Sequence, residues 1–165
     1  MNIDYFKPLS EEFIRESRNK VNWNYISQYQ KLNEKFIREF KDYVAWWHIS
    51  EYQKLSEDFI REFKDKVYWS YISHYQKLSE EFIKEFQDKV YWIYISQYQI
   101  LSENFIIEFQ NKIDWRLLLR KFGYELEFPF DDKFKIKSNS YCSDILDFPE
   151  LVKLALKLIS LKAFH

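Results

Sequence analysis

Apolar side chains return along the chain in the same order every 23 residues, with polar side chains between them. Residues 55–77 and 78–100 differ at only six of their 23 positions. Five units fit without a gap, at 9–31, 32–54, 55–77, 78–100 and 101–123. A fixed period of this length predicts a stacked repeat architecture.

Each unit predicts two short helices. The first carries apolar residues at helical spacing, such as Phe59 and Phe63, and the second carries Trp69 and Ile72, which share one helix face. A side chain that can cap a helix N-terminus precedes the first helix of every unit. These capping residues are Ser10, Asn33, Ser56, Ser79 and Ser102. We expect the recurring tryptophans to lie in the core between stacked repeats, since neither helix is long enough to bury them alone.

These patterns predict an all-α fold, a solenoid of about five two-helix repeats with a C-terminal cap. We assign the repeats to residues 1–123 and the cap to residues 124–165. In the cap, 124–128 and 133–137 alternate apolar and polar residues, which is typical of a β-hairpin, and 151–159 has the spacing of an amphipathic helix. Ile93, Ile100 and Ile107 replace polar residues of earlier repeats, so we expect the cap to pack over them and hide them.

Two sets of polar residues recur with the same period. Ser27 and Gln30 recur beside the apolar face of the second helix, and we expect them to form hydrogen bonds between repeats, because buried polar groups need partners. Arg15 recurs as Arg38, Arg61 and Lys84, always four residues after a glutamate. That spacing favours ion pairs along the helix, so this column is better read as a self-paired surface than as a track for phosphates.

The composition argues against several kinds of binding and catalytic site. The chain holds 25 basic and 26 acidic residues, whereas nucleic-acid binding usually needs an excess of positive charge. One Cys and three His lack the spacing of metal ligands, and a single Gly cannot build a phosphate-binding loop. We therefore expect no catalytic site, no cofactor and no metal. No apolar run suits a secretory signal or a membrane span, so we expect a cytoplasmic protein without membrane contact.

Where the repeats differ is more informative about binding. Two positions of the second helix vary freely and share one helix face. We name this set the variable face: Asn24, Gln28, Trp47, Glu51, Ser70 and His74. We expect it to bind a protein partner, with Trp47 as anchor, although mere exposure to solvent would also permit such variation. A tyrosine column at Tyr29, Tyr52, Tyr75 and Tyr98 is a second place where a groove could form.

The unit at 55–77 reads Leu-Ser-Glu-x-Phe-Ile-Arg-Glu-Phe-Lys-Asp-Lys-Val-x-Trp-x-x-Ile-Ser-x-Tyr-Gln-Lys. It resembles a tandem helical repeat found in proteins of large DNA viruses of amoebae. The resemblance covers 9–123 and implies a viral protein that acts inside an infected host cell, but it carries no activity. We therefore expect a non-enzymatic protein–protein interaction module. A structural or self-assembling virion or matrix protein and a nucleic-acid binder are the alternatives.

Overall fold

The computed structural model describes residues 3–121, 124–127, 134–138, 143–146 and 153, which belong to two compact units, Met1–Val90 and Tyr91–His165. The described part of the first unit holds α1 (Glu11–Glu16), α2 (Trp23–Tyr29), α3 (Glu34–Glu39), α4 (Trp46–Tyr52), α5 (Glu57–Glu62), α6 (Trp69–Tyr75) and α7 (Glu80–Glu85). The described part of the second unit holds α8 (Trp92–Tyr98), α9 (Glu103–Glu108), α10 (Trp115–Lys121), β1 (Tyr124–Glu127), β2 (Phe134–Ser138) and β3 (Ser143–Leu146).

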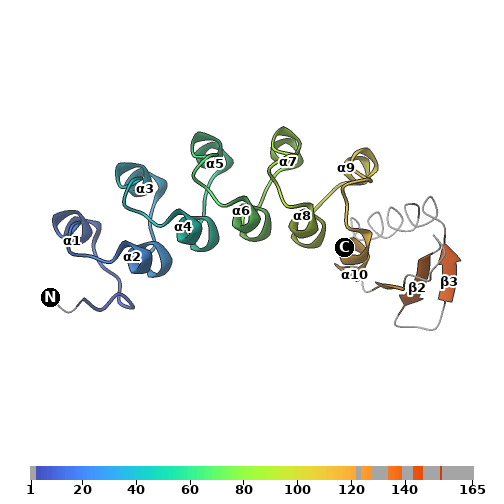
Figure 1. Cartoon of the computed structure of the whole chain (residues 1–165), viewed down its shortest axis with the longest axis horizontal. Helices are drawn as coiled ribbons and strands as arrows, with labels where there is room; N and C mark the ends of the chain where they lie inside the picture. Colours follow the sequence, from blue (N-terminus) through green and yellow to red (C-terminus); the bar gives the residue numbers. More distant parts are fainter. Residues whose placement is uncertain (1–2, 122–123, 128–133, 139–142, 147–152, 154–165) are drawn as a thin grey trace. The chain divides into compact units, whose positions relative to one another are not determined.

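The predicted helical-repeat fold is confirmed, because each 23-residue unit contributes one six-residue and one seven-residue helix. In the first unit the odd-numbered helices form one row and the even-numbered helices another (Figure 1). Helix α4 packs directly against both α2 and α6. In the second unit α8 packs against α10 in the same way. Successive repeats therefore bury their apolar faces against each other within each unit.

The odd-numbered helices begin at the capping residues that the sequence predicts. The side chains of Ser10, Asn33, Ser56, Ser79 and Ser102 each accept a hydrogen bond from the backbone N–H three residues later. The even-numbered helices of the middle repeats start differently, because Ala45 and Tyr68 have no capping side chain. Their backbone N–H groups instead donate to the hydroxyls of Ser27 and Ser50, one repeat earlier. A serine of one repeat thus fixes where the next even-numbered helix begins.

The core lies between the two rows of helices and is built from phenylalanine and isoleucine. Phe59 and Ile60 of α5 are completely buried, as is Ile72 of α6. The tryptophans that the sequence places in this core are only half-buried in repeats one to four, which corrects that expectation. Trp46 stacks on Phe59, with 6.2 Å between ring centroids, and its indole N–H donates to the Lys41 carbonyl at 2.9 Å. Its N–H needs a partner and its ring is large, so the indole covers the edge of the core rather than its centre.

A buried glutamine joins each repeat of the first unit to the one before it. Oε1 of Gln53 accepts the N–H of Leu32 at 2.9 Å. Its Nε2 donates to the carbonyl of Ser27 at 2.9 Å and to that of Gln30 at 2.8 Å. Gln76 makes the same three bonds one repeat later. The predicted hydrogen bonds between repeats are therefore confirmed, and they satisfy backbone groups that the loops would otherwise leave unpaired.

The segment before the first predicted repeat supplies the partners that Gln30 needs. Nε2 of Gln30 donates to the carbonyls of Tyr5 and Lys7, at 2.6 and 3.1 Å, and its Oε1 accepts the N–H of Leu9. Phe6, which lies 23 residues before Tyr29, contacts the Tyr29 ring with 4.8 Å between centroids. Residues 3–9 thus act as the end of an additional repeat, which the sequence analysis does not predict.

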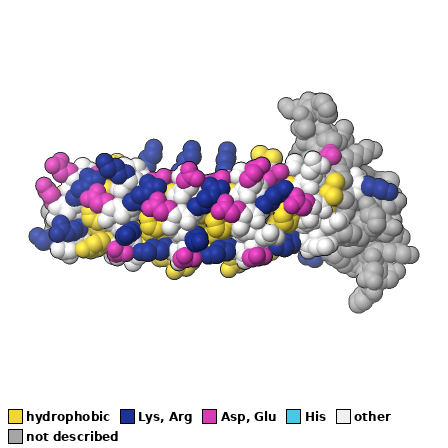
Figure 2. Space-filling view, turned by 90° about the horizontal axis from the view of Figure 1, so that it is seen from above, with side chains coloured by type: hydrophobic (Ala, Val, Ile, Leu, Met, Phe, Trp, Pro, Cys, Tyr) yellow, Lys and Arg dark blue, Asp and Glu magenta, His cyan; other side chains and the backbone are white. Residues whose placement is uncertain are grey.

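The charged column on the odd-numbered helices is self-paired, as the sequence predicts. Arg38 lies 3.7 Å from Glu34 of its own helix and 2.7 Å from Glu62 of the next repeat. Its guanidinium also lies over the ring of Phe59, 4.9 Å from the centroid. Arg15 and Arg61 repeat these contacts, and Figure 2 shows basic and acidic side chains side by side along this surface. Exposed pairs of this kind contribute little stability individually.

After the repeats, β1, β2 and β3 form an antiparallel sheet in that order. Tyr124 pairs with Ser138, so the predicted hairpin is present, whereas β3 was not predicted. The predicted helix over 151–159 lies outside the described residues, apart from Lys153, and the predicted boundary after residue 123 stays a prediction. The three isoleucines that we expected the cap to hide are exposed, which contradicts that expectation. Their exposed fractions are 48% for Ile93, 89% for Ile100 and 45% for Ile107.

Candidate binding surface

The variable face lies on three neighbouring helices of the first unit. It takes two side chains from each of α2, α4 and α6. Asn24 and Trp47 are exposed, while Gln28, Glu51, Ser70 and His74 are half-buried. Since α4 packs against both of its neighbours, the six positions form one continuous strip along the outside of the stacked helices.

Trp47 is the largest side chain on this strip. It is 39% exposed, and its ring stacks on the imidazole of His48. His48 itself is buried, with 4% of its surface exposed, and it stands where α2 has Tyr25 and α6 has Tyr71. Among the described residues, none offers a hydrogen-bond partner to Nδ1 of His48. This residue was not predicted, although a histidine at a position where neighbouring repeats have tyrosine is a signal that could have shown it.

Burial lowers the pKa of His48 below its usual range, and the nearby carboxylate of Glu51 only partly opposes this shift. Folding therefore favours the neutral imidazole. Below about pH 6.5 the unfolded chain binds a proton that the folded chain resists, so the protein loses stability as the pH falls from that value towards the lowered pKa.

We predict that His48→Tyr, which restores the residue of neighbouring repeats, removes this pH dependence. Between pH 7 and pH 5 the wild-type protein should lose up to about 1.4 kcal/mol per pH unit relative to the variant. Urea unfolding at a series of pH values measures the difference. Parallel stability curves for the two proteins would contradict a buried neutral imidazole.

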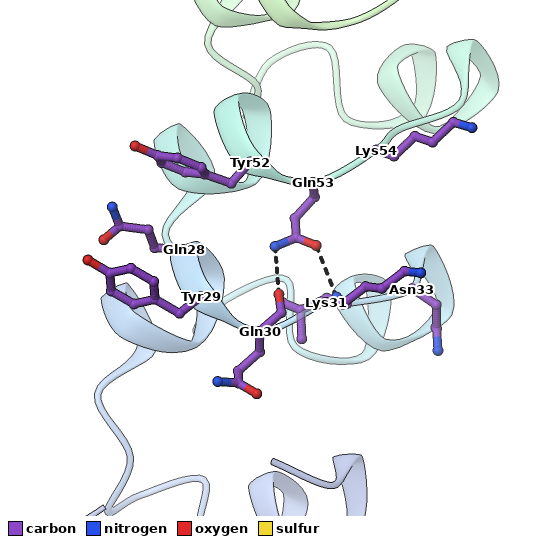
Figure 3. A pocket seen from close by; sticks show the side chains of 9 residues that line it. Gln28, Tyr29, Gln30, Lys31, Asn33, Tyr52, Gln53 and Lys54 are labelled. Carbon is purple, nitrogen blue, oxygen red and sulfur yellow. Dashed lines mark hydrogen bonds between the residues drawn. The ribbon is translucent and has the colours of Figure 1, made fainter. Parts of the chain in front are cut away.

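An open groove of about 670 Å³ borders the variable face at the junction of the first two repeats. Its walls carry Gln28, Tyr29, Lys31, Asn33, Tyr52 and Lys54. Figure 3 shows the amide of Gln53 at its base, already engaged with the backbone of the preceding repeat. The two tyrosines are 44% and 49% exposed. The groove thus offers aromatic rings, hydroxyls, amides and two ammonium groups, and none of its lining residues is acidic.

The described residues contain no group of three or more His, Cys, Asp or Glu side chains that could hold a metal ion. Nor does the part of the chain with a described structure include a helix long and apolar enough to cross a membrane. Comparison of the chain with protein-family models finds no match, and neither do comparisons with curated proteins and with solved structures.

Proposed function

We propose that this chain is a non-enzymatic protein–protein interaction module that binds its partner through the variable face. The observation that carries this proposal is Trp47, a large aromatic side chain exposed on a helix that packs against both of its neighbours. Its counterparts Asn24 and Ser70 show that stacking does not require an aromatic residue there. Exposed aromatic residues on rigid supports are typical anchors of protein interfaces.

The resemblance of the repeat unit to a repeat in proteins of large DNA viruses of amoebae supports a cellular setting for this binding. On that basis the protein is virus-encoded and acts in the cytoplasm of an infected cell. Nucleic-acid binding is the less favoured function, because Arg15, Arg38 and Arg61 are engaged by neighbouring carboxylates and the whole chain has a net charge of −1.

Self-assembly is a second candidate, and one observation favours it. Ile93, Ile100 and Ile107 are exposed in the second unit, and exposed apolar side chains favour association between copies. Light scattering at increasing protein concentration tests this candidate directly. A constant monomer mass up to high micromolar concentration would exclude it.

The double variant Trp47→Ser and Glu51→Gln tests the main proposal. Both new residues occur at the same positions of other repeats, Ser70 and Gln28, so the fold should be retained. We expect loss of the proteins that co-purify with the wild type, because removing one hot-spot residue costs about 2 kcal/mol or more of binding free energy, roughly 30-fold in affinity.

A matched control is Tyr43→Lys, since Tyr43 is also an exposed aromatic residue, at 46%, and other repeats carry lysine there. It lies outside the variable face and should leave the set of partners unchanged. If the double variant kept all partners with its helical content intact, the binding surface would lie elsewhere.

A further inference from the structure

Helix α4 differs from the other even-numbered helices at three neighbouring positions. Trp47 stands where α2 and α6 have asparagine and serine, His48 where both have tyrosine, and Glu51 where they have glutamine and histidine. Elsewhere in the five predicted repeats, no aromatic residue stands at the first position, no histidine at the second and no acidic residue at the third. Three departures that coincide in one helix indicate a shared role.

The imidazole of His48 lies against the exposed indole of Trp47. The two ring centroids are 3.3 Å apart, and the ring of Tyr52 lies 5.6 Å from the imidazole. Only 4% of His48 is exposed, whereas Tyr25, at the same position of α2, is 41% exposed. Figure 3 shows Tyr52 pointing to the same side of Gln53 as the variable-face residue Gln28. The imidazole is therefore part of the support of Trp47 on this face.

This support suits the neutral imidazole. Nδ1 of His48 has no hydrogen-bond partner among the described residues. A neutral ring can carry an unprotonated Nδ1, but an imidazolium has a proton on both nitrogens and needs an acceptor for each. A buried charge without such partners is costly, and burial accordingly lowers the pKa of His48. Protonation therefore favours movement of the ring out of its buried place.

The helices that pack against α4 supply no carboxylate to receive the charge. These helices are α2 and α6, and their titratable side chains are Tyr25, Tyr29, Tyr71, His74 and Tyr75. The tyrosines stay neutral below about pH 10. Among the described residues, the charged group that acts on His48 is Glu51, which raises its pKa and stands three residues later on α4. Glu51 lies on the variable face, so an imidazolium that turns towards it leaves Trp47 without its support.

We propose that His48 is a positioning residue that holds Trp47 in place while its imidazole is neutral and releases it when protonated, so that partner binding weakens at acidic pH. This inference rests on the proposed function and adds a means of regulation to it. The attraction between an imidazolium and the face of an indole opposes the release, but it provides no acceptor for Nδ1. Release should begin below pH 6.5 or so, about the ordinary pKa of histidine, because burial disfavours the charged form.

Fluorine NMR of the full chain labelled with 5-fluorotryptophan follows Trp47 without any partner. The chain holds six tryptophans, and the signal that disappears in Trp47→Ser belongs to Trp47. Between about pH 7.5 and pH 5 this signal should shift, and a soluble gadolinium chelate should broaden it more strongly at the lower pH. Neither change should occur in His48→Tyr. A signal that does not shift, or that shifts without becoming more accessible to the chelate, would overturn the proposal.

Two further variants identify the titrating group. His74→Gln is the matched control, because it removes another histidine of the variable face and glutamine stands at this position in the first and fourth repeats. Its Trp47 signal should shift over the same pH range as in the wild type. Glu51→Gln should move the midpoint to lower pH, since the Glu51 carboxylate raises the pKa of His48. Loss of the shift in His74→Gln, or an unchanged midpoint in Glu51→Gln, would overturn the assignment to His48, even if His48→Tyr failed to fold.

Binding is measured with the proteins that co-purify with the chain at neutral pH. A wash at about pH 5 should release most of them from the wild type and a much smaller fraction from His48→Tyr, each compared with the same protein before the wash. Equal released fractions would overturn the proposal. If Trp47→Ser with Glu51→Gln removed these proteins while the Trp47 signal did not respond to pH, the inference would fail and the proposed function would stand. If that double variant kept them all, the proposed function would fail, and regulation of binding through Trp47 would fail with it.

Discussion

Replacing Phe59 by alanine should lower the free energy of unfolding by about 3–5 kcal/mol. Phe59 is completely buried between the two rows of helices, and it contacts Trp46 of the preceding repeat and Phe63 of its own. Arg38 also lies over its ring. Alanine would leave a cavity that these surrounding groups, fixed by stacking on both sides, cannot easily fill. Urea unfolding followed by circular dichroism measures the loss.

Trp46→Ala is the matched comparison, because Trp46 contacts the same ring but is only half-buried. It should cost clearly less than Phe59→Ala, although its indole is the larger group. Equal or reversed losses would show that the tryptophans rather than the phenylalanines form the centre of the core.

Replacing Gln53 by leucine should cost about 3 kcal/mol or more, even though leucine is similar in size and more apolar. The substitution leaves the N–H of Leu32 and the carbonyls of Ser27 and Gln30 without their partner. Each unsatisfied buried polar group costs about 1–3 kcal/mol. Thermal unfolding of Gln53→Leu beside the wild type provides the measurement.

Gln53→Glu gives a sharper test of the same contacts. A carboxylate can still accept the N–H of Leu32. Its other oxygen, however, faces the carbonyl oxygens of Ser27 and Gln30, which accept hydrogen bonds from the Gln53 amide in the wild type. We expect a larger loss than for leucine at pH 7 and partial recovery near pH 4, where the protonated acid can donate again. A variant as stable as the wild type at pH 7 would mean that the glutamine does not hold the repeats together.

The period and the identity of the repeating residues were enough to predict the helical repeats. Apolar spacing defined the helices, and side chains such as Ser56 and Asn33 marked their starts, because capping is a local interaction. Gln53 could also be predicted to bond between repeats, since an amide that recurs beside an apolar face needs a partner nearby. These features depend on contacts that every repeat makes in the same way.

The features that escaped prediction depend on contacts outside the regular repeat. Residues 3–9 carry only fragments of the pattern, so their packing on Gln30 and Tyr29 was not apparent. Recurrence alone cannot distinguish a residue at the centre of the core from one at its edge, which is why Trp46 was placed too deep. Ile100 was expected to be covered because it stands where earlier repeats have a polar residue, yet it is exposed. An apolar residue at such a position need not be buried. His48 escaped notice because its contacts with the rings of Trp47 and Tyr52 were not apparent from the sequence.

The glutamine bonds also give the chain a direction of growth. Gln53 and Gln76 each reach back to backbone groups 21–26 residues nearer the N-terminus, and residues 3–9 provide the first such groups for Gln30. On a ribosome, where the N-terminus emerges first, each of these three glutamines meets an edge whose backbone donors and acceptors are already in place. Synthesis and assembly can therefore proceed in the same order, and each completed repeat serves as the template for the one that follows.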